Sequence, residues 1–192
     1  MSEAKAFAWR QVLVEYLEAG AIAVVLAAFI MTFIARSFTV DGVSMYPTLH
    51  NGERLLVDEI SYRFHAPRRG DIVVFRYPAN PSERFIKRVI GLPGDTVVVQ
   101  NGAVYLNGIK LHEPYIAEPT YERPGTYVVP PGTLFVMGDN RNNSEDSRFP
   151  DVGYVPRGNV IGKAVFRFWP LSRMGLIERP QALASPLLDQ QK

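Results

Sequence analysis

The stretch VVVQNGAVYLNGIKL (97–111) contains three short apolar segments separated by two Asn-Gly pairs, Asn101-Gly102 and Asn107-Gly108. Asn and Gly both tolerate the positive φ angles of a type I′ turn, so each pair predicts a two-residue β-hairpin. Two consecutive hairpins of this kind predict a three-stranded meander. This meander is the strongest local indication of the fold.

Short strands and turns continue on both sides of the meander, and no long helical period is found between residues 37 and 178. Pro93-Gly94 suits the two central positions of a type II turn. We expect strands at Arg54–Asp58, Asp71–Arg76, Phe85–Ile90, Thr96–Gln100, Thr126–Val129, Leu134–Met137 and Val160–Phe168. The prediction is a mostly β domain over 37–178, followed by a flexible C-terminal tail over 179–192.

The 192-residue chain carries 47% hydrophobic and 21% charged residues, which is typical of a globular protein with one main domain. Its net charge of +2 is too balanced to indicate nucleic-acid binding. The absence of cysteine excludes thiol catalysis, disulfides and cysteine metal sites. The three histidines, His50, His65 and His112, lack a metal-ligand spacing, so no metal site is expected.

Residues 19–35, AGAIAVVLAAFIMTFIA, form an uncharged run that would be about 25 Å long as a helix. That length is near the lower limit for crossing a hydrocarbon core of roughly 30 Å. A cleavable signal peptide and a buried core helix are the alternatives, but the run exceeds the usual signal-peptide core and has no polar face. We therefore predict a transmembrane anchor over 19–36, preceded by an N-terminal cytoplasmic lead over 1–18. The basic residues favour this orientation only slightly.

The strand FIKRVI (85–90) places Lys87 on one face between Phe85 and Val89, since side chains alternate across a strand. Burial disfavours the charged form of an amine and lowers its pKa. A lysine with a pKa near 8 is neutral in about one molecule in ten at pH 7, against about one in 2,500 at its reference pKa. Lys87 is thus a candidate general base if it faces inward, and an ordinary edge-strand lysine if it faces water.

Ser44 lies in VDGVSMYPTL (40–49), where Gly42 and Pro47 restrict the backbone on either side. A serine hydroxyl is a poor nucleophile until a base removes its proton, and no histidine is an obvious partner. A constrained serine and a buried lysine on neighbouring strands would form a Ser–Lys dyad. An ordinary serine between a strand and a turn has the same local pattern.

Four segments, SMYPTL (44–49), RRGDIVVFR (68–76), FIKRVIGLPGD (85–95) and GDNRNNSEDSR (138–148), follow the apolar run in this order. Any one of them is weak alone, but together they resemble bacterial type I signal peptidase, the leader peptidase that removes signal peptides from exported proteins. The resemblance covers essentially residues 19–170. It implies an antiparallel β-sheet catalytic domain, tethered by one N-terminal transmembrane helix, on the extracytoplasmic side of the bacterial cytoplasmic membrane.

Carried over by position, the resemblance implies roles for individual residues. Ser44 corresponds to the nucleophile and Lys87 to the general base of a Ser–Lys endopeptidase that needs neither metal nor cofactor. Ser144 occupies the position of a serine that orients the lysine, and Met45 would lie beside the nucleophile at the substrate cleft. Structural support is implied for Arg88, Asp146 and Arg148, and a scaffold role is expected for Asp139, Asn140 and Arg141.

Gly42 marks a departure from family members that carry a serine two residues before the nucleophile, whose hydroxyl helps to stabilise the oxyanion. A side-chain donor of this kind can be worth about 3–4 kcal/mol. The oxyanion hole is therefore expected to rest on backbone donors, chiefly the Ser44 N–H. The hairpin region over 97–127 is short, so any accessory β region is expected to be small.

The resemblance implies signal-peptide-bearing preproteins as substrates, cleaved after A-x-A sites, and we expect a monomer in the lipid bilayer. A self-cleaving regulator of the SOS-repressor type is a rival with a similar Ser–Lys core, but such proteins carry a DNA-binding domain and no anchor. A noncatalytic tethered β domain that binds peptides is a second rival, and it would not be acylated at Ser44.

The tail contains an A-x-A sequence of its own, Ala182-Leu183-Ala184 followed by Ser185. Trimming of the chain after Ala184 by a neighbouring molecule is one hypothesis, and a chance pair of alanines is the alternative.

Overall fold

The computed structural model describes residues 3–33 and 35–184, and the chain divides after Arg36 into two compact units. The first unit contains helix α1 (Glu3–Phe33), so the segment predicted as an N-terminal lead is helical from Glu3 onward. Among the described residues, no helix is both long enough and apolar enough to cross a membrane, and the predicted transmembrane helix is not confirmed.

From residue 35 onward the described chain is mostly strand. The larger sheet contains β1 (Ala35–Thr39), β2 (Arg54–Asp58), β3 (Ile72–Arg76), β4 (Arg84–Gly91), β9 (Thr133–Met137), β10 (Val155–Pro156), β11 (Val160–Trp169) and β12 (Gly175–Leu176). The smaller sheet contains β5 (Thr96–Gln100), β6 (Ala103–Leu106), β7 (Ile109–Lys110) and β8 (Gly125–Val128). Short helices are α2 (Ser61–Phe64), η1 (Arg157–Asn159), η2 (Leu171–Arg173) and η3 (Gln181–Ala184).

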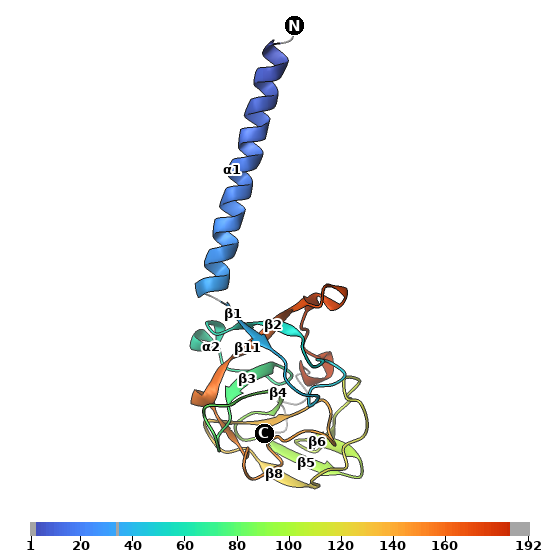
Figure 1. Ribbon diagram of the computed structural model, residues 1–192. Helices are drawn as coiled ribbons and strands as arrows, with labels where there is room; N and C mark the ends of the chain where they lie inside the picture. The colour runs from blue at the N-terminus through green and yellow to red at the C-terminus, as the bar shows by residue number, and fades with distance from the viewer. Residues whose placement is uncertain (1–2, 34, 185–192) are drawn as a thin grey trace. The chain divides into compact units, whose positions relative to one another are not determined.

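Strand β4 is an inner strand of the larger sheet, paired with β3 on one side and β9 on the other (Figure 1). The larger sheet has the order β1-β2-β11-β3-β4-β9-β10, with β12 paired to β11, and the smaller one has the order β7-β6-β5-β8. The mostly β prediction is confirmed, and each of the seven predicted strands is present within two residues of its expected bounds.

The predicted meander is confirmed as β5-β6-β7, with antiparallel pairing across both turns. Asn101 and Gly102 have φ angles of 49° and 74°, and Asn107 and Gly108 have φ angles of 51° and 82°. Positive φ at both central residues is the requirement of a type I′ turn, which explains why Asn-Gly occupies both sites.

The centre of the larger sheet is buried on both of its faces. Alternation along β3 puts Ile72 and Val74 in one apolar cluster, while Val73 and Phe75 lie in another. On the neighbouring strand β4, the residues from Lys87 to Gly91 are accordingly buried on both faces, whereas Arg84 is exposed and Phe85 and Ile86 are half-buried. This burial is the property of the fold that matters most for Lys87.

The C-terminal segment packs against the domain at Leu183, which corrects the prediction of a loose tail from residue 179. Leu183 is 2% exposed and joins the apolar cluster of the smaller sheet. Burying a leucine side chain contributes roughly 1.5–3 kcal/mol, which offsets the cost of ordering this short turn. Cleavage after Ala184 would require Leu183 to leave this site first, and Ser185 lies outside the described residues.

Candidate active site

Lys87 lies on β4 opposite Val73 of β3, and its side chain is 4% exposed. Burial lowers the pKa of the amine from 10.5 to about 8. Three carboxylates, Asp146, Glu145 and Asp139, oppose this shift because they favour the charged form. The lysine therefore faces inward, which is the orientation that the general-base hypothesis requires.

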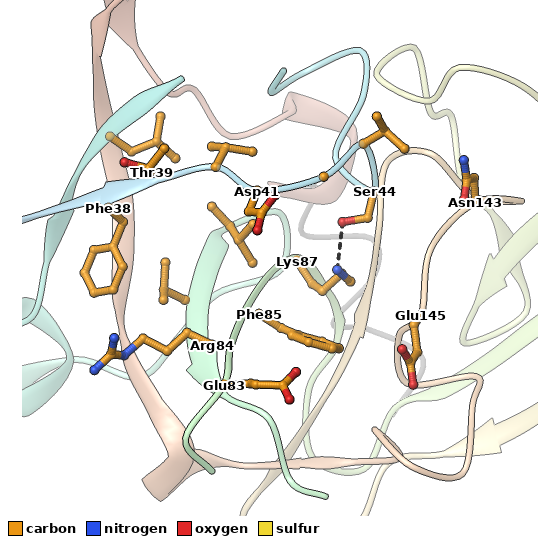
Figure 2. Close-up of a pocket in the computed structure, with 16 residues that line it drawn as sticks. Phe38, Thr39, Asp41, Ser44, Glu83, Arg84, Phe85, Lys87, Asn143 and Glu145 are labelled. Atoms are coloured by element: carbon orange, nitrogen blue, oxygen red, sulfur yellow. Dashed lines mark hydrogen bonds between the residues drawn. The ribbon is translucent and has the colours of Figure 1, made fainter. Parts of the chain in front are cut away.

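Ser44 lies in the turn segment after β1, and the structure brings it to Lys87 across 43 positions of sequence. Lys87 Nζ and Ser44 Oγ are 2.8 Å apart and hydrogen bonded, as the dashed line in Figure 2 marks. This distance allows direct proton transfer between the hydroxyl and a neutral amine.

Aromatic rings form much of the environment of the lysine amine. Lys87 Nζ lies 5.0 Å from the centroid of the Phe85 ring. Tyr77 stacks on Phe85 with a centroid distance of 4.4 Å and an interplanar angle of 9°. The Phe85 ring is thus one apolar neighbour of the amine, and burial of the amine is the cause of its lowered pKa.

Loop 138–148 holds the peptide of the nucleophile. The Asn140 N–H donates to the Ser44 carbonyl oxygen at 3.0 Å, and Asn140 Nδ2 donates to the Val43 carbonyl oxygen at 3.1 Å. A Cβ on Gly138 would overlap the Ser44 carbonyl oxygen, so glycine permits this close approach. Only a general scaffold role was expected for Asn140, because contacts between residues 97 positions apart leave no local pattern.

Two buried ion pairs stabilise this loop. Arg88 pairs with Asp139 at 2.7 Å, and Arg148 pairs with Asp146 at 2.8 Å. Asp146 also accepts a hydrogen bond from the Gly138 N–H at 2.9 Å. The three residues expected to give structural support, Arg88, Asp146 and Arg148, thus lie within these pairs.

A third pair connects the loop to the accessory region. Arg141 pairs with Glu113 at 2.6 Å and donates to Thr120 Oγ1 at 3.1 Å. The ring of Tyr115 lies against Arg88, 4.3 Å from ring centroid to guanidinium carbon. The small region over 97–127 therefore contributes directly to the support of the active-site loop.

Ser144 is buried, and its Oγ has no hydrogen-bond partner among the described residues. The hydroxyl lies against Gly138, where any side chain would occupy its place. It makes no bond to Lys87 in this conformation, so the lysine-orienting role stays a prediction from the resemblance.

The backbone explains the glycine at position 42. Gly42 has a φ of 92°, a region that L residues rarely adopt. Its N–H donates to Asn51 Oδ1 at 2.8 Å, a contact that no sequence pattern indicated. A serine at this position would be strained in the present backbone conformation.

Met45 does not lie where the resemblance implied. Its side chain is 1% exposed and packs in the apolar cluster that also contains Val40, Leu55 and Val74. These three neighbours line the cleft, whereas Met45 is not among the lining residues. Burial of the flexible thioether against the strands places it behind the cleft wall.

A cleft of about 530 Å³ opens in front of the Ser44–Lys87 pair. Its long walls are the extended segments 38–44 and 83–87, as Figure 2 shows, and Asn143 and Glu145 line it beyond the pair. β9 pairs with β4 only from Arg88 onward, so the edge of β4 before that residue has no strand partner on this side. The cleft can therefore accept an extended peptide through backbone hydrogen bonds.

The family model described as signal peptidase, peptidase S26, matches residues 13–169. The chain belongs to this family. The signal peptidase match includes the Ser44 turn, β4 and the loop 138–148, and so covers the whole cleft.

Curated relatives agree with the family match. The chain is 50% identical over 176 residues to a signal peptidase I of Leptolyngbya laminosa, covering 88% of this chain and 85% of the relative. It is 40% identical over 166 residues to a signal peptidase I of Bacillus caldolyticus, covering 79% and 89%. A crystal structure of a signal peptidase I from Enterococcus faecalis V583 matches with a TM-score of 0.45 at 35% identity, covering 52% of this chain and 97% of that one.

The described part of this signal peptidase family member has no group of three His, Asp or Glu side chains placed to hold a metal ion. The polar groups at the cleft are instead one buried amine, one hydroxyl and the carboxylates of Asp41, Glu83 and Glu145.

Proposed function

We propose that the protein is a membrane-bound serine endopeptidase that removes signal peptides from exported preproteins after A-x-A sites. Ser44 is the nucleophile and Lys87 is the general base. The observation that supports this most strongly is the 2.8 Å contact between Ser44 Oγ and a lysine amine that burial makes easy to deprotonate. The similarity to curated signal peptidases I adds the substrate class.

The reaction begins with neutral Lys87. Its amine accepts the hydroxyl proton as Ser44 Oγ attacks the scissile carbonyl carbon, and an oxyanion forms on the carbonyl oxygen. The protonated amine then gives this proton to the leaving nitrogen, the C–N bond breaks, and an acyl-enzyme remains. Lys87, neutral again, removes a proton from water as the water oxygen attacks the acyl carbon; the ester bond to Ser44 Oγ then breaks, and the protonated amine returns the proton to Oγ.

The Ser44 backbone N–H is the proposed oxyanion donor. Within residues 35–184 this N–H has no hydrogen-bond acceptor in the protein, so it is available to a substrate oxygen. Asn140 fixes the Val43 and Ser44 carbonyls on either side of it, which pre-orients the donor. A fixed donor costs no reorganisation during the reaction, which is the main source of oxyanion stabilisation.

Substrate recognition follows from the cleft walls. The acyl side of the substrate lies along segments 38–43 and 84–86, where the apolar lining side chains Phe38, Val40, Leu55, Val74 and Ile86 are found. Apolar walls of this kind suit small alanine-like side chains at the first and third positions before the scissile bond. Backbone hydrogen bonds to the open edge of β4 would hold the peptide extended.

The membrane-bound part of the proposal rests on the sequence. The uncharged run over 19–35 would hold the enzyme in the same bilayer as a translocating preprotein. Sharing a bilayer raises the effective concentration of enzyme near its substrate without any new contact. The same run predicts that the full chain remains with the membrane fraction after washing with salt.

The purified full chain, in detergent, should cleave a synthetic peptide that contains a signal-peptide A-x-A site, and mass spectrometry should place the cut directly after the second alanine. The matched variant Ser44→Ala should leave the peptide intact. A mechanism-based acylating inhibitor should add its mass to the wild type at Ser44 and not to the variant. An intact peptide together with no acylation of the wild type would refute the proposed function.

A further inference from the structure

The two ends of the cleft differ in chemistry. On one side of the Ser44–Lys87 pair the walls carry the apolar side chains described above. On the other side Asn143 and Glu145 line the cleft, and both are exposed. Figure 2 shows Phe38, Thr39 and Arg84 on one side of the pair and Asn143 and Glu145 on the other.

This arrangement fixes the direction of the bound peptide. The small side chains before the scissile bond need the apolar walls, so the acyl part occupies the side of Phe38. The scissile carbon must lie at Ser44 Oγ. The residues that follow the bond therefore pass over Asn143 and Glu145.

Glu145 is a carboxylate with no ion-pair partner among the residues that the structure describes. The other two carboxylates of loop 138–148 differ in this respect, because Asp146 is paired with Arg148 and Asp139 with Arg88. The contact to Glu145 is a hydrogen bond from the Tyr77 hydroxyl to Oε1, at 3.1 Å. That bond fixes the side chain and leaves its negative charge unbalanced at the cleft.

Tyr77 holds this carboxylate in a defined position. Its ring stacks on Phe85, which in turn packs beside the Lys87 amine. Glu145 is thus linked through two rings to the strand that carries the base. A carboxylate positioned in this way can discriminate between charged groups that approach the same part of the cleft.

We propose that Glu145 is a specificity-determining residue that reads the first two residues after the scissile bond, favouring a basic side chain and disfavouring an acidic one. This inference rests on the proposed function and adds a preference on the leaving-group side of the substrate. The interaction is electrostatic and exposed, so it is expected to weaken as salt increases.

The test must separate substrate preference from an effect on the base, because the charge of Glu145 also acts on Lys87. A ratio of kcat/KM for two substrates of the same enzyme removes any change in the base. Two pairs of signal-peptide substrates are needed, identical up to the scissile bond, with Lys or Glu at the first position after the bond in one pair and at the second in the other.

For the wild type, the Lys peptide of at least one pair should be cleaved about fivefold more efficiently than the Glu peptide at low salt, a ratio typical of exposed charge pairs. Glu145→Gln should bring that ratio close to one, and Glu145→Lys should invert it. Tyr77→Phe should give an intermediate ratio, because the carboxylate stays but loses its fixed position. The exposed position of Glu145 makes both of its variants compatible with folding.

Asp41→Asn is the matched control, because it removes a carboxylate of the same cleft on the acyl side. The wild-type ratio should persist in this variant whatever its overall rate. Equal cleavage of Lys and Glu peptides by the wild type in both pairs, or an unchanged ratio in Glu145→Gln, would overturn the inference while leaving the proposed function intact. Failure to cleave any of the four peptides would instead overturn the proposed function, and this inference with it.

Discussion

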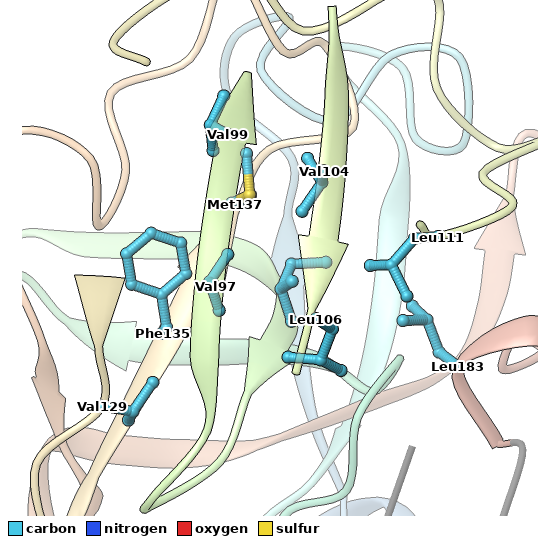
Figure 3. Packing of buried hydrophobic residues seen from close by; sticks show 10 residues of the cluster. Val97, Val99, Val104, Leu106, Leu111, Val129, Phe135, Met137 and Leu183 are labelled. Atoms are coloured by element: carbon cyan, nitrogen blue, oxygen red, sulfur yellow. The ribbon is translucent and has the colours of Figure 1, made fainter. Parts of the chain in front are cut away.

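The core under the smaller sheet and the active-site loop both contain buried side chains, but those of the first are apolar and many of those of the second are charged. Under the smaller sheet, Figure 3 shows Val97, Leu106, Phe135 and Leu183 in an apolar cluster without a charge. Much of loop 138–148 is also buried, yet its buried part contains arginine–carboxylate pairs and lies beside a buried amine. The first region contributes stability by burying apolar surface, and the second uses buried charges to hold the active-site residues in position.

This difference explains why charges occur inside the domain at all. A buried ion pair is often no more stabilising than well-packed apolar residues of similar size. Here the ion pairs hold the loop in place. The loop can then donate from Asn140 to the Ser44 carbonyl and keep its carboxylates near Lys87. The core under the smaller sheet is thus a packing region, and loop 138–148 is a positioning region.

Replacement of Lys87 should have the strongest effect on activity. Lys87→Met should reduce kcat/KM for a signal-peptide substrate by about 10⁴-fold or more, because the base is lost, while circular dichroism and the thermal melt show an intact fold. Lys87→Arg should be equally inactive, since a guanidinium does not deprotonate. Retained activity in Lys87→Arg would mean that positive charge, and not basicity, matters at this site.

Removing one partner of a buried pair tests the positioning region. Asp146→Ala should lower the free energy of unfolding by about 3–5 kcal/mol, because Arg148 is left buried without a counter-charge. Denaturant unfolding measures the change. The double variant Asp146→Ala with Arg148→Met is the control and should recover part of the stability but not the activity, since the Gly138 N–H loses its acceptor. Full activity in the double variant would contradict the positioning role.

An apolar truncation tests the packing region. Leu106→Ala should cost about 3 kcal/mol of unfolding free energy through the cavity that it leaves under the smaller sheet. The activity of each folded molecule should stay close to that of the wild type, because Leu106 does not line the cleft. A loss of kcat/KM larger than the loss of folded protein would show that packing under the smaller sheet also affects the active site, and would contradict the separation of the two regions.

The smallest effect is the pH dependence of stability. Between pH 8 and 10.5 the unfolded state binds a proton at Lys87 that the folded state has lost, so stability should rise with pH across this window. Between pH 7 and 10 the wild type should gain on the order of 2 kcal/mol relative to Lys87→Met. Parallel stability curves for the two proteins would show that the folded state does not lower the pKa of the lysine.

Much of the fold could be predicted because its signals are local. Alternation and Asn-Gly pairs identified the meander, and the apolar neighbours of Lys87 indicated that it could face inward. The strands β10 and β12 were not predicted, since two residues are too few to establish alternation, and β1, which begins at the end of the apolar run, was missed as well. The packing of Leu183 was missed for a similar reason, because its partners come from strands some eighty residues earlier.

The dyad was inferred from the sequence, but most of its support was not. Asn140 and Asn51 act through hydrogen bonds to the backbone, and such bonds leave no residue pattern at the accepting position. The resemblance placed Met45 at the cleft, whereas in the structure its side chain packs in the apolar cluster with Val40 and Leu55. Glu145 carried no signal, because its importance depends on which of its neighbours are already paired.

The proposed reaction depends on the Lys87 amine being easily deprotonated beside Ser44. Nitrogen-detected NMR of the full chain in detergent, with the Lys87 signal assigned by its absence in Lys87→Arg, measures the pKa of that amine directly. We expect a pKa of about 8 for the Lys87 amine. A value near 10.5, the ordinary pKa of a lysine, would contradict it.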